Sequence, residues 1–127
     1  MILTISLGYL SFNSQLCTAG ISSDVVFEYT SPSKTQLSPG CLEFSFYMWG
    51  ETVQSLKITH INSLGSSETV WRKRGPIESV WYREMITLET LGTKIIFTAN
   101  CGETGTSDIA IDNISLIDKP CPGKYNA

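Results

Sequence analysis

The sequence has no long apolar segment. None of its runs approaches the ~20 consecutive apolar residues that a membrane-spanning helix needs, so no such helix is expected within its 127 residues. Residues 1–10 are apolar, but they lack a basic beginning and contain Gly8-Tyr9, which makes them a poor signal peptide. If the protein is exported, its export signal is therefore atypical or lies upstream.

Charge is also scarce. Charged residues make up 17% of the chain, compared with roughly 25% in a typical soluble domain, and the formal net charge is −3. Because no predicted face concentrates cations, we do not expect nucleic acid as a partner. The only cationic cluster in the sequence is Arg72-Lys73-Arg74, which we interpret as an exposed loop tip, with a binding patch as the alternative.

Groups that could perform catalysis are few. His60 is the single histidine, and at a predicted strand end it is interpreted as a surface or hydrogen-bonded residue. No serine lies in a nucleophile elbow, and the acids are not paired around His60, so no nucleophile–base pair is predicted. We therefore expect a protein that is not an enzyme.

The chain has four cysteines and no C-x-x-C pair. A single histidine and this spacing do not fit a Cys/His zinc site, so we do not expect the thiols to bind metal. Four cysteines in a small chain rich in Ser, Thr and Gly instead suit disulfides formed in an oxidising compartment. Counting alone leaves three connectivities open.

Alternation of apolar residues is the strongest positive signal. In residues 41–50, Leu42, Phe44, Phe46 and Met48 fall on one side of a predicted strand, which is typical of a half-buried β-strand. No segment carries a helical apolar stripe longer than about one turn. The chain is therefore predicted to be a single antiparallel all-β domain, either a sandwich or a barrel. Further strands are predicted at residues 9–12, 25–29, 55–61, 69–72, 81–88, 94–99 and 109–117, with a turn at 13–15 and a loop at 17–24.

The last predicted strand changes phase along its length. Ile109 and Ile111 lie on one side, whereas Ile114 and Leu116 lie on the other. A single β-bulge between the two pairs, near Asp112-Asn113, would bring all four side chains to the core. Because bulges re-aim side chains, the acids nearby are candidates for a site.

Asp108 and Asp112 are four residues apart and share a strand face unless the bulge intervenes. One hypothesis is a site for Ca²⁺ or Na⁺, completed by carbonyls of the loop at 102–105. The alternative is a turn-capping Asp108 and an Asp112 bonded to amides of a neighbouring strand. No other cofactor is expected.

Asn113-Ile114-Ser115 is the one N-glycosylation sequon. It falls in a predicted strand, whereas an acceptor asparagine prefers an exposed loop. We therefore expect Asn113 to be unmodified, with modification as the alternative if this strand has a solvent-facing edge.

The three tryptophans, Trp49, Trp71 and Trp81, admit two interpretations. In the first they fill the core or cover the faces of the sheets. In the second Trp49 and the neighbouring Tyr47 form an exposed aromatic platform for a partner or a sugar. The alternation predicts that both of these side chains lie on the polar side of their strand.

Several motifs occur in order along residues 8–121. They are Gly8-Tyr9-Leu10-Ser11-Phe12, Ser31-Pro32, Cys41-Leu42-x-Phe44-x-Phe46-x-Met48-x-Gly50, Trp71 with Trp81 and Leu88, Phe97-x-Ala99, Ser107-Asp108-Ile109-Ala110-Ile111-Asp112-Asn113-Ile114, and Cys121. Together they resemble the MAM domain, the extracellular module shared by meprins, neuropilins and some receptor tyrosine phosphatases. The departures are Tyr29 for the usual Leu, no Gly before Trp81, Ser107 for Gly, and Asn113 for Asp.

The resemblance implies a jelly-roll-like sandwich of two antiparallel sheets, and adhesive or oligomer-forming work outside the cell. It also implies that Cys41 pairs with Cys121. Cys17 and Cys101 are not at the family's usual positions, but both follow predicted strands and are left over after the first pairing. We expect them to form a second disulfide, with two free, buried thiols as the alternative.

The family module also has an upstream acidic segment, two cysteines and a tryptophan that are absent here. The chain therefore resembles either a domain that lacks its first strands or a divergent short form. An ion site would lose ligands that this segment supplies, and an uncovered sheet edge would favour self-association.

We expect residues 1–127 to form one MAM-like, non-catalytic interaction or adhesion module, extracellular and part of a larger secreted or membrane-anchored protein. The expected partner is a protein, including a second copy of the chain. The alternative is a lectin-like jelly roll that binds glycans through Tyr47, Trp49 and the loop at 102–107.

Overall fold

The computed structural model describes residues 2–5, 8–10, 14–17, 23–29, 38–50, 55–75, 78–101 and 108–122. The regular structure in these residues consists of strands, and no helix among them is long and apolar enough to cross a membrane. The strands are β1 (Ile2–Ile5), β2 (Gly8–Leu10), β3 (Ser14–Gln15), β4 (Ser23–Tyr29), β5 (Gly40–Trp49), β6 (Ser55–Ile61), β7 (Ser67–Arg74), β8 (Tyr82–Leu88), β9 (Lys94–Asn100) and β10 (Asp108–Ile117).

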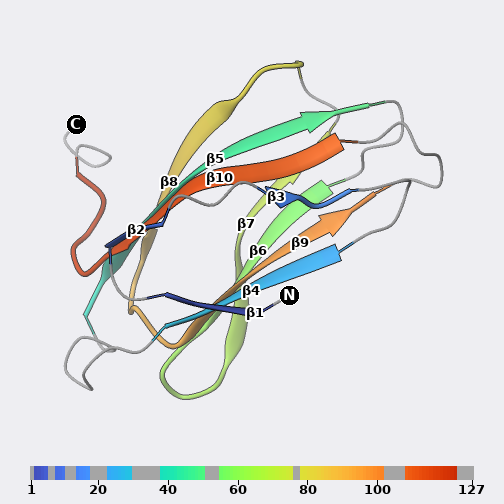
Figure 1. Cartoon of the computed structure of the whole chain (residues 1–127). Coiled ribbons are helices and arrows are strands. Elements are labelled where there is room, and N and C mark those ends of the chain that lie inside the picture. The colour runs from blue at the N-terminus through green and yellow to red at the C-terminus, as the bar shows by residue number, and fades with distance from the viewer. Residues whose placement is uncertain are drawn as a thin grey trace.

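The strands form two sheets that face each other (Figure 1). The first, called the β5 sheet, has the order β2-β10-β5-β8, and β3 also pairs with β10. The second, called the β9 sheet, has the order β1-β4-β9-β6-β7. The prediction of an all-β sandwich of two antiparallel sheets is confirmed, with one local exception: β1 runs parallel to β4.

The core lies between the sheets and follows from the alternation. The even-numbered side chains of β5, from Leu42 to Met48, are buried, whereas Tyr47 and Trp49 face outward. Phe44 of the β5 sheet makes an edge-to-face contact with Phe97 of the β9 sheet, with ring centroids 5.3 Å apart. Other large core side chains from the two sheets are Phe27, Leu56, Ile58, Ile95, Ile109 and Ile111.

The predicted bulge in the last strand is confirmed. The register of β10 against β5 shifts between Asp112 and Ser115, and Asn113 has a left-handed φ of 53°. An extra residue in the strand restores the inward phase, so Ile109 and Ile111 before the bulge and Ile114 and Leu116 after it are all buried.

Three local predictions were wrong. Ser14 and Gln15 are not a turn, because they pair with Ile111 and Ala110 of β10. The segment predicted as a loop at 17–24 ends in β4, which begins at Ser23. The cluster Arg72-Lys73-Arg74 is not a loop tip, because it forms the end of β7, paired with β6.

Two disulfides lie at opposite ends of the sandwich. Cys41 in β5 is bonded to Cys121 beyond β10, which is the pairing that the family resemblance implies. Cys17 follows β3 of the β5 sheet and is bonded to Cys101, which follows β9. The second bond therefore links the two sheets covalently.

Gly92 lies where the turn before β9 meets the end of β6. Its φ is +69°, and a β-carbon there would lie 2.7 Å from His60 Nε2 and overlap the carbonyl oxygen of Ile61. We expect Gly92→Ala to lower the free energy of unfolding by about 2–3 kcal/mol, because left-handed strain adds to this overlap. Urea unfolding would measure the change.

Gly65 provides the matched control. It also has a positive φ, +86°, but no atom lies within 4 Å of its would-be β-carbon. Gly65→Ala should therefore show only the backbone cost of roughly 1 kcal/mol. Equal losses at the two glycines would contradict the close approach at Gly92.

Candidate functional site

The outer face of the β5 sheet carries an exposed aromatic patch, which consists of Tyr47, Trp49 and Trp81. Trp49 and Trp81 are 49% and 47% exposed, which is unusual for such large side chains. Tyr47 and Trp49 alternate with the buried Met48, so both project to the solvent side of β5. Trp81 comes from the residue before β8 and lies beside Tyr47, with ring centroids 5.7 Å apart.

One ring of the patch is held in place by a hydrogen bond. Tyr47 Oη lies 2.6 Å from Ser79 Oγ, in the segment that leads to Trp81. This hydrogen bond joins the residues before Trp81 to β5, so it helps to keep the Trp81 ring against the Tyr47 ring. An aromatic surface fixed in this way loses little side-chain freedom on binding.

A polar row adjoins the patch on the same face. Ser45 of β5 pairs with Arg83 of β8, and Arg83 also forms an ion pair with Glu43. Arg83 Nη1 lies 3.5 Å from Ser45 Oγ, so the guanidinium spans the two β5 side chains. This row gives the patch a hydrogen-bonding border on one side.

Asp108 and Asp112 lie on β10, which pairs with β5 on the side away from β8. Asp108 lies opposite Trp49, and Asp112 lies opposite Ser45, so both share the outer face, because the bulge comes only after Asp112. Four residues of strand separate their α-carbons by about 13 Å, too far for both carboxylates to bind one ion. The Asp112 carboxylate accepts a hydrogen bond of 2.7 Å from the Asn113 amide.

The proposed cation site is therefore not assembled by these two acids alone. The part of the chain that the structure describes contains no group of three or more His, Cys, Asp or Glu side chains placed to hold a metal. The loop at 102–105, which was predicted to complete the site, lies outside the described residues. Binding of Ca²⁺ or Na⁺ at Asp108 or Asp112 stays a prediction.

Asn113 lies in the interior of the β5 sheet rather than in a loop. Its strand has β5 on one side and the short strands β2 and β3 on the other. The asparagine occupies the bulge and is half-buried. Whether it is glycosylated stays a prediction.

His60 has a structural role. Its side chain is buried, and Nε2 donates a hydrogen bond of 2.7 Å to the Leu91 carbonyl oxygen. This contact fixes the turn before β9 against the end of β6. The hydrogen-bonded interpretation of His60 is confirmed, and its ring is not positioned to act as a base on a bound substrate.

Sequence reasoning found Tyr47 and Trp49 but missed Trp81 and Ser79 as members of the same surface. The pattern in β5 is enough to expose the first two side chains. Trp81 joins them because β8 pairs with β5 in a register that places Phe46 opposite Tyr82. That register is set by the fold and leaves no local signal in the sequence.

The sequence comparison finds a matching family model and a matching curated relative. The family model described as "MAM domain, meprin/A5/mu" matches residues 6–122. The MAM domain-containing protein 2 of Mus musculus is 34% identical over 85 residues, which is 65% of this chain. The match spans 12% of the length of the mouse protein.

Comparison with solved structures finds the same sandwich in other proteins. A family 16 carbohydrate-binding module superposes with a TM-score of 0.53 at 12% identity, covering 87% of this chain and 75% of that one. A mutant of a family 29 carbohydrate-binding module superposes with a TM-score of 0.54 at 18% identity, with the same coverage. These likenesses show a shared fold, and the family-model match over nearly the whole chain shows that the chain belongs to the MAM domain family.

Proposed function

We propose that the chain is a non-catalytic extracellular interaction module that uses the aromatic patch as its contact surface. The MAM family membership supports an interaction role outside the cell. The two disulfides are consistent with an oxidising compartment. On this proposal the chain is one module of a larger secreted or membrane-anchored protein. The match to the mouse relative likewise covers only 12% of that longer protein.

The observation that carries the proposal is the exposure of two tryptophans on one sheet face. Tyr and Trp are enriched at the centres of protein interfaces, because each buries a large area at a small cost in conformational entropy. The flanking polar row and the two acids resemble the polar rim that surrounds such anchors. The patch therefore has the composition of a protein-binding surface.

The partner that we propose is a second copy of the chain. Homophilic contact between two aromatic patches would be isologous, with each ring set packed on its counterpart about a twofold axis. Such a contact would bury Trp49 and Trp81 and leave the acids and Arg83 at the rim.

A double substitution tests this proposal. Trp49→Ala with Trp81→Ala should weaken self-association by about tenfold or more, because aromatic anchors contribute most of the energy of an interface. Sedimentation equilibrium over a range of concentrations would measure the dissociation constant. Leu64→Ala is the control, because Leu64 is 88% exposed in the β6–β7 turn and belongs to neither patch nor core. A wild-type chain that stays monomeric at high concentration would contradict homophilic contact.

The aromatic patch also supports a second candidate function, a lectin-like glycan-binding module. Two solved structures with this fold are carbohydrate-binding modules. The exposed Trp49 ring and the carboxylate of Asp108 opposite it offer a sugar both a flat apolar surface and hydrogen-bond acceptors. A glycan array probed with the wild type and the double tryptophan variant separates the two functions: hits that vanish in the variant favour the lectin, and an array without hits eliminates it.

A further inference from the structure

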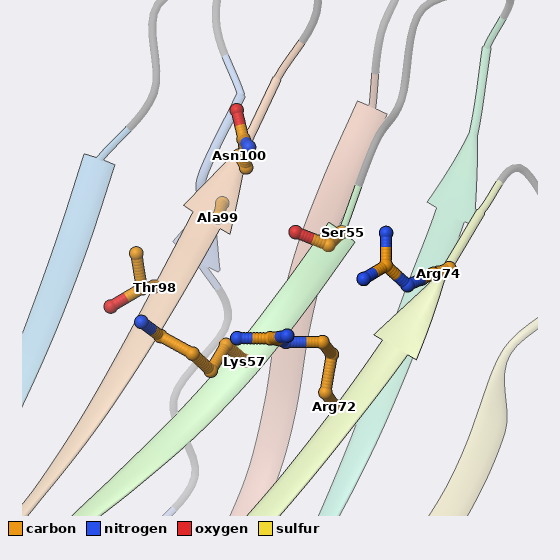
Figure 2. A pocket seen from close by; sticks show the side chains of 7 residues that line it. All are labelled: Ser55, Lys57, Arg72, Arg74, Thr98, Ala99 and Asn100. Carbon is orange, nitrogen blue, oxygen red and sulfur yellow. The ribbon is translucent and has the colours of Figure 1, made fainter. Parts of the chain in front are cut away.

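The outer face of the β9 sheet carries a different surface, a shallow hollow lined by cations (Figure 2). Its volume is about 370 Å³. It lies across β9, β6 and β7, on the opposite side of the sandwich from the aromatic patch. Its lining residues are Ser55, Lys57, Arg72, Arg74, Thr98, Ala99 and Asn100.

Strand register brings the cations together. Lys57 of β6 lies directly opposite Arg72 of β7, and Ser55 lies opposite Arg74. On the other side of β6, Lys57 pairs with Thr98, and Ser55 pairs with Asn100. The hollow therefore consists of two adjacent cross-strand rows, each with cationic and neutral hydrogen-bonding side chains.

The cationic side chains point toward the hollow, although Arg72 and Arg74 stay exposed. Figure 2 shows Arg72 reaching over β6 toward Lys57, and Lys57 reaching toward Thr98 on β9. In the second row, Arg74 points toward Ser55, which lies opposite it. Three cationic groups therefore surround one space, with hydroxyl and amide groups between and beside them.

These charges are not compensated by the described part of the protein. The ion pairs found among the described residues join Arg83 to Glu43 and Lys94 to Glu28, and none involves a cation of the hollow. The acid in the same cross-strand row is Asp24, which lies on β4 beyond Thr98. Like charges directly opposite each other on neighbouring strands are destabilising, so folding alone does not favour Lys57 facing Arg72.

We propose that this hollow binds the sulfate groups of a sulfated linear glycan. Guanidinium groups bind tetrahedral oxyanions through paired hydrogen bonds, and two arginines with a lysine can hold more than one sulfate. The hydroxyls of Ser55 and Thr98 and the amide of Asn100 can bond sugar hydroxyls or further sulfate oxygens.

The lining favours a sulfated glycan over an acidic protein segment. A protein partner usually anchors an aromatic or large aliphatic side chain in a pocket. Among the described residues that line the hollow there is no aromatic or large aliphatic side chain, and Ala99 is the apolar one. A glycan with sulfates along its length needs separated cations and hydrogen-bonding groups, which the two cross-strand rows provide.

The test uses a heparin-derived oligosaccharide of defined length and the same oligosaccharide after chemical desulfation. Titration calorimetry should show binding of the sulfated form that weakens with added salt, because exposed charges are screened. Arg72→Gln, Arg74→Gln and Lys57→Gln should each weaken it by about fivefold, a value typical of one partly exposed charge-assisted contact. Melting temperatures at or above that of the wild type would show that the variants are folded.

Two controls separate this site from general electrostatics and from the aromatic patch. Lys94→Gln removes one positive charge from the same sheet, where Lys94 is paired with Glu28, and should leave binding within about twofold. Trp49→Ala should also leave it unchanged, because it alters the opposite face.

Four outcomes would overturn the proposal. Equal binding of the desulfated oligosaccharide would show that sulfate is not recognised. No measurable binding of the sulfated form would show that the hollow is not a glycan-binding site. A loss in Lys94→Gln as large as in Arg72→Gln would show that net charge alone is responsible. Equally tight binding of polyglutamate would assign the hollow to an acidic peptide instead.

Discussion

Phe44→Ala is expected to lower the free energy of unfolding by about 3–5 kcal/mol, because it removes a fully buried ring from the contact between the sheets. The centroid of the Phe44 ring lies 5.2 Å from that of Trp71 and 5.3 Å from that of Phe97, both on the β9 sheet. It lies 5.8 Å from the ring centroid of Phe46 on its own strand. The neighbouring rings cannot fill the cavity that alanine leaves unless their strands shift and lose hydrogen bonds of the sheets. Urea unfolding followed by tryptophan fluorescence would measure the loss.

Phe44→Leu is the matched control. Leucine keeps most of the buried apolar volume and should lose only about 1–2 kcal/mol, because a partly filled cavity costs less than an empty one. A loss below about 1.5 kcal/mol for Phe44→Ala would mean that the cluster of Phe44, Trp71 and Phe97 is not packed as described.

The effect of this substitution follows from a feature that could be read from the sequence. The period-two pattern around Phe44 identifies both the strand and its buried face, because a half-buried strand must alternate. The same logic located the bulge near Asp112, since two apolar pairs of opposite phase need one extra residue between them. Local patterns therefore predict strands, faces and irregularities within strands.

What could not be predicted depends on the pairing of distant segments. Ser14-Gln15 is polar and short, and it is a strand only because β10 provides its ladder. The parallel pairing of Ile2–Ile5 with β4 likewise has no signal in the apolar run itself. In both cases tertiary contacts decide the conformation and local propensity does not.

The cationic segment shows the same limit for a binding surface. The sequence predicts Arg72-Lys73-Arg74 as an exposed loop tip, with a binding patch as the alternative. In the structure it continues β7, and alternation places Arg72 and Arg74 on the outer face beside Lys57 of β6. The cluster therefore becomes a site only through a residue fifteen positions upstream of Arg72, which a linear pattern does not connect to it.

The two outer faces differ in chemistry although the two sheets share one core. The face of the β5 sheet presents aromatic rings with acids at one border, whereas the face of the β9 sheet presents cations with hydroxyl and amide groups. Because inward residues hold the sheets together, the outward residues of each strand are free to differ without a cost in packing. On the two proposals made above, one domain would contact a protein through one face and an anionic glycan through the other.

The two disulfides stabilise the sandwich at its opposite ends. The bond between Cys41 and Cys121 closes a loop with a sequence separation of 80 residues, and that between Cys17 and Cys101 one of 84. By the chain-entropy model a loop of this length contributes roughly 4 kcal/mol, because it restricts the unfolded chain. The two loops overlap in the sequence, so their contributions are not expected to add fully.

Removing Cys41 and Cys121 together, as Cys41→Ala with Cys121→Ala, should therefore lower the free energy of unfolding by about 4 kcal/mol, a large part of the 5–15 kcal/mol usual for a domain. Guanidinium unfolding without reductant would measure the loss. The matched pair Cys17→Ala with Cys101→Ala should lose a similar amount, because the two loops are almost equally long. This second variant also releases the bond between the sheets, so it should expose more buried amides to hydrogen exchange than the first. A loss below about 1 kcal/mol in either variant, or a peptide map of the wild type with Cys41 bonded elsewhere, would contradict this account of how the sandwich is stabilised.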